Sequence, residues 1–186
     1  MTVTDLLIPT YRQMLRALTA WLGKSRDQLG DGDALMAARL APDMFPLATQ
    51  VRFACLQAYE GAYRLRHEAF APVLDELLQE GRDGGDSPGT MDEALARIDQ
   101  TLAFLDTVAP DALDHGAGQD LALELPMGIA FDMTGETYAR DWALPQFYFH
   151  LMTAYAILRN QGVELGKVDY VQHMFAYLRP GTGPAS

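Results

Sequence analysis

Apolar side chains recur at helical spacing in four stretches of the chain. The first stretch carries them at steps of four and three residues, which places them on one face of a helix. Its stripe consists of Leu7, Tyr11, Met14, Leu18 and Trp21. Because proline disrupts the hydrogen bonding of a helix interior, this helix either begins or bends at Pro9.

The second stretch follows Pro42 and Pro46 and has a stripe rich in small residues. This stripe consists of Leu47, Val51, Ala54, Ala58, Ala62 and Leu65. Small side chains let a neighbouring helix approach closely, as the packing of ridges into grooves requires. The pattern therefore predicts a helix with a close helical neighbour.

The third and fourth stretches have recognisable ends. The third begins with Thr90 and Glu93, which match a capping box. The fourth runs from about Pro145 to Arg159 and stops before Gly162, a residue suited to the left-handed conformation that often ends a helix. The apolar stripe of the third consists of Met91, Leu95, Ile98, Leu102 and Leu105.

Two segments interrupt these helices. Residues 79–90 are rich in Gly, Asp, Ser and Pro, which predicts a mobile loop inside one domain. Residues 120–133 alternate apolar and other side chains on both sides of a Pro126–Gly128 turn, which predicts a short β-hairpin. Because an isolated hairpin is marginally stable in water, it must lay an apolar face on the helices.

These elements predict an all-α fold, an antiparallel four-helix bundle with a small β-hairpin between the third and fourth helices. A length of 186 residues fits one domain with a single core. We assign residues 1–175 to this domain and residues 176–186 to a C-terminal tail.

Charge and composition exclude several classes of partner. The net charge of −11 comes from 25 acidic and 14 basic residues, with no Lys/Arg cluster of the kind that binds nucleic acid or an anionic membrane surface. The apolar runs are too short to span a membrane, and the N-terminus lacks the features of a secretory signal, so we expect a cytoplasmic protein. A single cysteine, Cys55, excludes an internal disulfide and a cysteine-based zinc cluster and is expected to be an inert apolar residue.

The histidines do not form a ligand pattern of their own. His67, His115, His150 and His173 show no His-to-His step of three or four residues, which would place two ligands on one helical face. Only His150 lies in a strongly apolar helix, with Gln146 one turn before it. His150 is therefore either a hydrogen-bonded core residue, the commoner case for a lone histidine, or a ligand or catalytic group.

Two acidic residues and a run of aromatic residues leave further alternatives open. Asp43 and Asp141 precede predicted helices, where aspartate usually caps the N-terminus; alternatively, Asp43 orients or activates His150. Three consecutive aromatic residues, 147–149, cannot all face one core. Part of this set must contact the hairpin, a pocket or a second subunit, and packing on the hairpin is the simplest of these.

Two blocks of sequence, residues 38–55 (ARLAPDMFPLATQVRFAC) and 144–170 (LPQFYFHLMTAYAILRNQGVELGKVDY), carry a family resemblance. They resemble the signature blocks of an uncharacterised bacterial domain-of-unknown-function (DUF) family grouped with the DinB/YfiT-like superfamily of metalloenzymes. Residues 94–106 resemble the third helix of that family. The resemblance covers most of the chain and implies a DinB-like four-helix bundle.

The resemblance also implies where a site would lie. Many members of the superfamily hold a divalent metal, often nickel or zinc, through one histidine on the second helix and a His-x-x-x-His pair on the fourth. His150 matches the second histidine of the pair, Gln146 stands at the first, and Gln50 stands near the helix-two position. Glutamine is a weak neutral donor, so a His/Gln/Gln set would bind nickel or zinc poorly, and the thiol-dependent activities of the superfamily are not carried over.

Two hypotheses remain at this stage. In the first, the chain is a DinB-like enzyme with a degenerate or lost metal site, in which His150 is a metal ligand or the general base and Gln50, Gln146 and Asp43 help to bind a small molecule, with or without metal. In the second, the bundle is a non-catalytic binding or dimerisation module. A homodimer is expected under both hypotheses.

Overall fold

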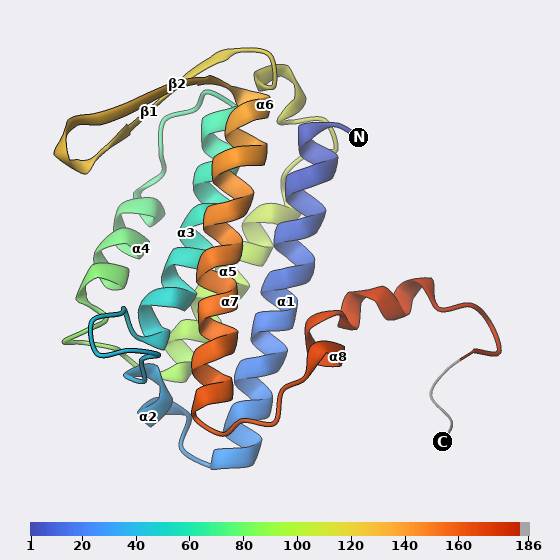
Figure 1. Cartoon of the computed structure of the whole chain (residues 1–186). Helices are drawn as coiled ribbons and strands as arrows, with labels where there is room; N and C mark the ends of the chain where they lie inside the picture. Colours follow the sequence, from blue (N-terminus) through green and yellow to red (C-terminus); the bar gives the residue numbers. More distant parts are fainter. Residues whose placement is uncertain (183–186) are drawn as a thin grey trace.

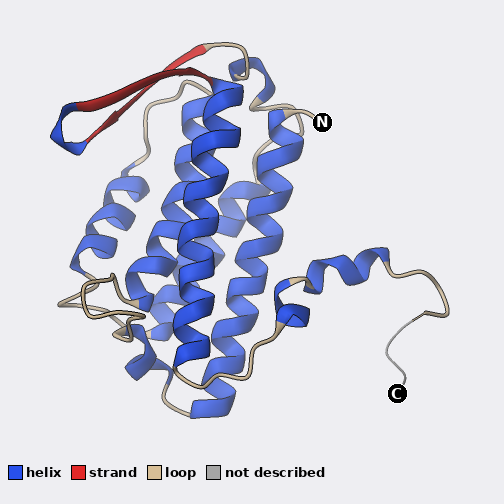
Figure 2. Ribbon diagram, viewed as in Figure 1, coloured by secondary structure: helices blue, strands red, loops and turns tan. Residues whose placement is uncertain are grey.

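A computed structural model of the chain describes residues 1–182 (Figure 1). The helices are α1 Val3–Leu29, α2 Gly32–Met36, α3 Leu47–Leu65, α4 Pro72–Asp83, α5 Met91–Asp106, α6 Gly135–Tyr138, α7 Leu144–Asn160 and α8 Lys167–Tyr170. The strands β1 Asp120–Leu125 and β2 Ile129–Thr134 pair antiparallel (Figure 2). The predicted class, a mainly helical fold with a small antiparallel sheet, is confirmed.

The long helices α1, α3, α5 and α7 pack side by side, and their apolar stripes form the core (Figure 1). The predicted stripe of α1, from Leu7 to Trp21, is at most 1% exposed. This helix begins at Val3 with a capping box between Thr2 and Asp5 and continues through Pro9, so Pro9 does not mark its start.

Helix α3 is the central element and contacts α4, α5 and α7. Its alanines Ala54, Ala58 and Ala62 are fully buried, which permits the close approach of these neighbours. The N-cap of α3 is Pro46, with no side-chain cap, so the predicted capping role of Asp43 is wrong. Asp43 lies exposed in the turn before the helix.

The predicted loop 79–90 begins later than its composition indicates. Helix α4 continues to Asp83, and only residues 84–90 are irregular. Its residues Leu74 and Leu77 are buried in the core. Gly81 is buried against the ring of Phe53, where a Cβ atom would lie 2.2 Å from Phe53 Cε1. Close packing on α3 thus explains why a glycine lies inside α4, although in the sequence alone it indicates the end of a helix.

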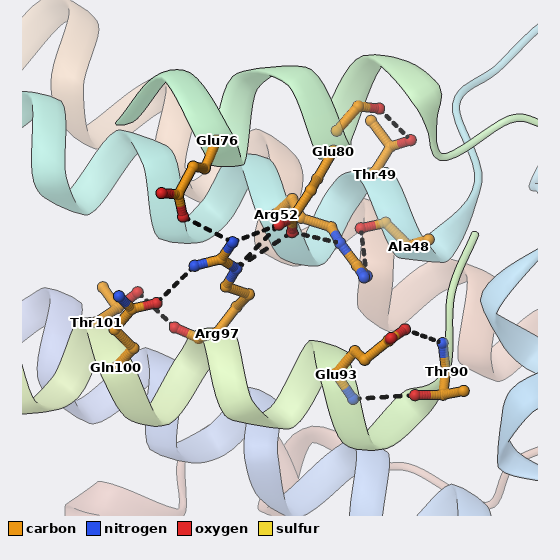
Figure 3. Close-up of polar contacts among 11 residues, drawn as sticks. Ala48, Thr49, Arg52, Glu76, Glu80, Thr90, Glu93, Arg97, Gln100 and Thr101 are labelled. Carbon is orange, nitrogen blue, oxygen red and sulfur yellow. Dashed lines mark hydrogen bonds and ion pairs between the residues drawn. The ribbon is translucent and has the colours of Figure 1, made fainter. Parts of the chain in front are cut away.

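A network of charged residues joins α4 to α3 and α5 (Figure 3). The Arg97 guanidinium on α5 donates to Glu80 through Nε at 3.2 Å and through Nη2, and to Glu76 at 2.9 Å. Arg52 on α3 is only 5% exposed, and its Nε lies 3.5 Å from Glu80. Charge-assisted hydrogen bonds of this kind hold the outer helix α4 in a fixed position.

The last long helix begins earlier than predicted. Helix α6 starts after the N-cap Thr134, and a π-helical segment, Ala139–Ala143, joins it to α7 without a break. Asp141 therefore lies inside helical structure, exposed and paired with Arg140 at 2.7 Å, and its predicted role as an N-cap is wrong.

The strands β1 and β2 form a hairpin that lies across one end of the helices and extends over α4 (Figure 1). Leu121 and Leu123 of β1 are buried, whereas Phe131 of β2 is 42% exposed. The hairpin thus applies one apolar row to the helices and leaves its second strand largely in solvent.

The segment after α7 returns to the first helix. The Trp21 indole Nε1 donates to the backbone oxygen of Asp169 at 3.2 Å, and Lys24 Nζ lies 3.0 Å from the Asp169 carboxylate. Residues 172–177 begin in contact with α1 and then extend outward from the helices (Figure 1). No helix within residues 1–182 combines the length and apolarity needed to cross a membrane.

Candidate functional site: a cavity beside His150

A cavity of about 450 Å³ lies between α3, α4, β1 and the N-terminal half of the α7 helix. A volume of this size accommodates a small molecule. We call it the His150 cavity. Its lining is Phe45, Phe53, Leu56, Gln57, Glu60, Arg64, Phe70, Leu74, Asp75, Leu78, Arg82, Leu123, Glu124, Leu125, Pro126, Trp142 and His150.

The protonation of His150 follows from the hydrogen bonds of its partner Gln50. Gln50 is 2% exposed, and its Nε2 donates to the backbone oxygen of Phe45 at 3.1 Å. The Gln50 Oε1 therefore faces His150 Nδ1, at 3.0 Å, and an amide oxygen there requires that Nδ1 carry the hydrogen. The lone pair of His150 is then on Nε2, with which no residue in 1–182 forms a hydrogen bond.

The surroundings of His150 keep the ring neutral. Burial lowers the pKa of His150 from 6.5 to about 4. The rings of Phe53 and Phe149 lie edge-on to the imidazole of His150. Their centroids are 5.2 Å and 5.4 Å from the centroid of that ring, respectively. At neutral pH the side chain is therefore an uncharged imidazole that offers a hydrogen-bond acceptor at Nε2.

The predicted site residues separate into two groups. The structure brings His150 and Gln50 together, although they are 100 residues apart in sequence. Gln146 is partly exposed on the turn before His150, and neither it nor Asp43 lines the cavity. In the part of the chain that the structure describes, their side chains make no hydrogen bond with His150, so the geometry does not support the placement of either beside it.

The residues at this position do not fit a transition-metal centre. The amide oxygen of Gln50 accepts the hydrogen of His150 Nδ1. This oxygen and the lone pair of His150 Nε2 therefore do not converge on one metal position. Nothing in residues 1–182 groups three or more His, Cys, Asp or Glu side chains as metal ligands. A single imidazole with neutral amides is a weak donor set for nickel or zinc, which normally take three strong ligands.

The sequence reasoning missed a polar row on α3 that lines the same cavity. Phe53, Gln57, Glu60 and Arg64 follow one another at steps of four, three and four residues, so they share a helical face. Gln57 Nε2 donates to Glu60 at 3.3 Å, and Arg64 Nη2 donates to the other oxygen of Glu60 at 3.3 Å. This spacing was visible in the sequence but is also typical of a solvated helix face.

A buried tyrosine adjoins this row. Tyr138 of α6 is 0% exposed, and burial raises the pKa of its hydroxyl, an effect that the positive charge of the neighbouring Arg64 partly opposes. The Arg64 guanidinium also lies 4.9 Å from the centre of the Phe70 ring. Arg64 is thus surrounded by Glu60, Tyr138 and Phe70, all within the protein.

The other candidate side chains lie away from the cavity. His67 and His115 are exposed, the first with a left-handed backbone (φ 52°) directly after α3. His173 belongs to the C-terminal segment 172–177. Cys55 is fully buried, and burial raises the pKa of its thiol to about 12, so it remains protonated and unreactive, as predicted.

Comparison with known proteins defines the class of this fold and then its family. The chain is similar to a DinB family member protein from Shewanella denitrificans, whose crystal structure it matches with a TM-score of 0.74 and 31% identity over 97% of this chain and 95% of that one. The chain belongs to the family described as Domain of unknown function (DUF1993), which it matches over residues 3–171. The predicted resemblance to a DUF family of DinB-like proteins is confirmed. No curated protein matches the chain.

Proposed function

We propose that the protein binds a small, partly apolar molecule in the His150 cavity. The observation that carries this proposal is a neutral histidine, fixed by Gln50, in the wall of a cavity of about 450 Å³. Binding sites of this kind are mostly apolar and contain a few oriented polar groups. In this proposal α1, α3, α5 and α7 are the DinB-like four-helix bundle, and the hairpin closes one side of the ligand site.

Within this proposal, His150 acts as a hydrogen-bond acceptor in preference to a general base. A general base works best when its pKa lies near the working pH. Burial lowers the pKa of His150 to about 4, so the ring retains a proton poorly at neutral pH. The lowered pKa therefore favours a role for His150 in ligand binding over a role in acid–base catalysis.

Blocking the cavity tests the proposal. Leu78 lines it from α4, and Leu78→Trp would place a larger side chain there. The matched control is Leu29→Trp, at an exposed position at the end of α1. Ligand-observed NMR with a library of small aromatic and aliphatic compounds should give hits for the wild type and the control that Leu78→Trp loses. Hits that persist in a folded Leu78→Trp protein would refute the assignment of the site.

We also propose that the metal site of DinB-like relatives is replaced here by the His150–Gln50 hydrogen bond. Elemental analysis of the untagged protein beside a His150→Asn variant tests this directly. We expect substoichiometric nickel and zinc in both proteins. A near-stoichiometric metal in the wild type that His150→Asn removes would overturn the proposal and restore a metalloenzyme.

A second candidate function, self-association, is favoured by the outer face of α7. Pro145, Phe149 and Met152 are exposed at steps of four and three residues, and Phe149 is 59% exposed. An exposed apolar row of this kind is a common feature of dimer interfaces. Sedimentation velocity should show a dimer that Phe149→Glu dissociates. A monomeric wild type at high concentration would exclude this candidate.

A further inference from the structure

The inner wall of the His150 cavity carries three groups that can accept hydrogen bonds, beside one cation, Arg64. Gln57 lines the cavity and is only 9% exposed, and its buried Oε1 has no hydrogen-bond partner within residues 1–182. The hydrogen bond from Gln57 Nε2 to Glu60 fixes the orientation of this amide, because an amide oxygen would not face a carboxylate. Gln57 Oε1 therefore requires a donor.

Two further acceptors lie on the same wall. His150 Nε2 carries a lone pair, since the hydrogen is held on Nδ1 by Gln50. The Glu60 carboxylate receives one bond from Arg64 and one from Gln57, but its two oxygens can accept about four. The wall therefore offers acceptors from an imidazole, an amide and a carboxylate.

The cation on this wall is already engaged within the protein. Arg64 is paired with Glu60, lies near the hydroxyl of Tyr138 and lies against the ring of Phe70. Its charge is therefore neutralised mainly by Glu60, although its buried Nε has no hydrogen-bond partner within residues 1–182. Of the charged groups nearer the mouth, Asp75 and Glu124 are acidic and Arg82 is basic, all three exposed. With Glu60 and Arg64 the lining has three carboxylates and two guanidinium groups, a formal charge of −1.

The rest of the cavity lining is largely aromatic, which suits the apolar part of a ligand that donates hydrogen bonds. The aromatic residues in the lining are Phe45, Phe53, Phe70 and Trp142, besides His150. The faces of aromatic rings attract cations as well as apolar groups, and tryptophan does so most strongly. The protein as a whole carries a net charge of −11, which favours the approach of a positively charged ligand.

We propose that the ligand of the His150 cavity is an amphipathic amine, protonated at neutral pH. Its apolar body lies against the aromatic and leucine side chains, and its N–H groups donate to Gln57 Oε1 and the Glu60 carboxylate. This inference rests on the proposed function, because it specifies the chemistry of a molecule bound in that cavity.

Three probes with one apolar body test the inference: phenylpropylamine, phenylpropanol and phenylpropanoate. Binding to the full chain is measured by saturation-transfer NMR and by the fluorescence of Trp142, with Trp142→Phe to identify the contribution of Trp21. We expect the amine to bind at least about tenfold more tightly than the carboxylate, with the alcohol between them. Leu78→Trp should abolish the binding of all three.

Two variants test which residues cause the preference for the amine. Glu60→Gln removes the negative charge at nearly constant shape and should weaken the amine about tenfold while changing the alcohol little. Its matched control, Glu164→Gln, lies at an exposed position outside the cavity and should have no effect. Should Glu60→Gln not fold, Gln57→Leu, with Gln161→Leu as an exposed control, should weaken both the amine and the alcohol.

The possible failures are distinguishable. If the carboxylate binds as tightly as the amine, or Glu60→Gln leaves a folded protein with unchanged preference, the amine inference is overturned while the cavity remains a binding site. If no probe binds at about 1 mM, both the inference and the proposed function are overturned.

Discussion

His150 couples the stability of the fold to pH through its buried imidazole. Burial lowers its pKa from 6.5 to about 4, so the folded chain keeps the ring neutral at a pH where the unfolded chain protonates it. The unfolded state therefore binds more protons than the folded state between these two values. The stability contributed by the neutral ring is complete above pH 6.5 and is lost as the pH falls toward about 4.

The size of this effect follows from the two pKa values. Their difference corresponds to roughly 3 kcal/mol of unfolding free energy, taken over the whole interval. The side chain is partly exposed at the cavity wall, and water there reduces the penalty of charging it. We therefore expect a measured loss of about 1.5–3 kcal/mol that is specific to His150.

Urea unfolding of the wild type and of His150→Asn, between about pH 7.5 and pH 4, measures this loss. Asparagine places an amide N–H near the position of Nδ1, so it can still donate to Gln50, but it does not titrate. The difference in unfolding free energy between the two proteins should shift in favour of the variant as the pH falls. His67→Asn is the matched control, because His67 is exposed with a left-handed backbone that asparagine tolerates. Parallel profiles for the wild type and His150→Asn would refute the reasoning.

Three further changes test the packing around the site. Gly116→Ala would place a Cβ atom 1.9 Å from the backbone oxygen of Leu65 and should destabilise the fold by about 3 kcal/mol, whereas Gly118→Ala, with no atom within 4 Å, should change it by less than about 0.5 kcal/mol; equal melting temperatures would contradict this. Tyr11→Phe removes a fully buried hydroxyl that has no hydrogen-bond partner in the described part of the chain, so the free energy of unfolding from urea titration should stay unchanged or rise by up to about 1 kcal/mol; a fall of more than about 1 kcal/mol would show that the hydroxyl is satisfied. Arg97→Gln should cost about 1–2 kcal/mol and speed hydrogen exchange in α4 more than in α1, and uniform exchange would show that the charged network does not hold α4.

Sequence periodicity predicted the long helices because each buries a stripe that its own residues define. The stripe from Leu7 to Trp21 is wholly in the core, and the capping box of Thr90 and Glu93 forms as expected. Local signals of this kind need no knowledge of the neighbouring elements.

Elements that depend on their neighbours were harder to predict. Helix α4 contains Gly81 and ends before a Gly-rich segment, and its stability comes from the Phe53 ring and from Arg97, which are distant in sequence. The helical start at Gly135 was missed for a related reason: Pro145 resembles a first helical residue, and a π-helical segment has no simple sequence signature. In both cases tertiary structure overrides the local pattern.

The candidate site shows the same division. The family resemblance pointed to His150 and Gln50, and the structure places them in contact. The contributions of Gln57, Glu60 and Arg64 could not be separated from those of an ordinary solvated face, because elements distant in sequence, among them the hairpin, α4 and α7, enclose them. A cavity formed by several elements is a property of the assembled fold and cannot be predicted from any one of them.

The pairing of α1 with the end of the chain has a consequence for folding during synthesis. Lys24 and Asp169 form a contact across 145 residues, and α7, which completes the core against α1 and α3, is also made late. Helix α1 leaves the ribosome first, yet its apolar stripe cannot be fully covered until α7 and α8 have followed. Until those last helices are made, the apolar stripe of α1 can pack only against α2, α3 and α5, so part of it stays uncovered in the nascent chain.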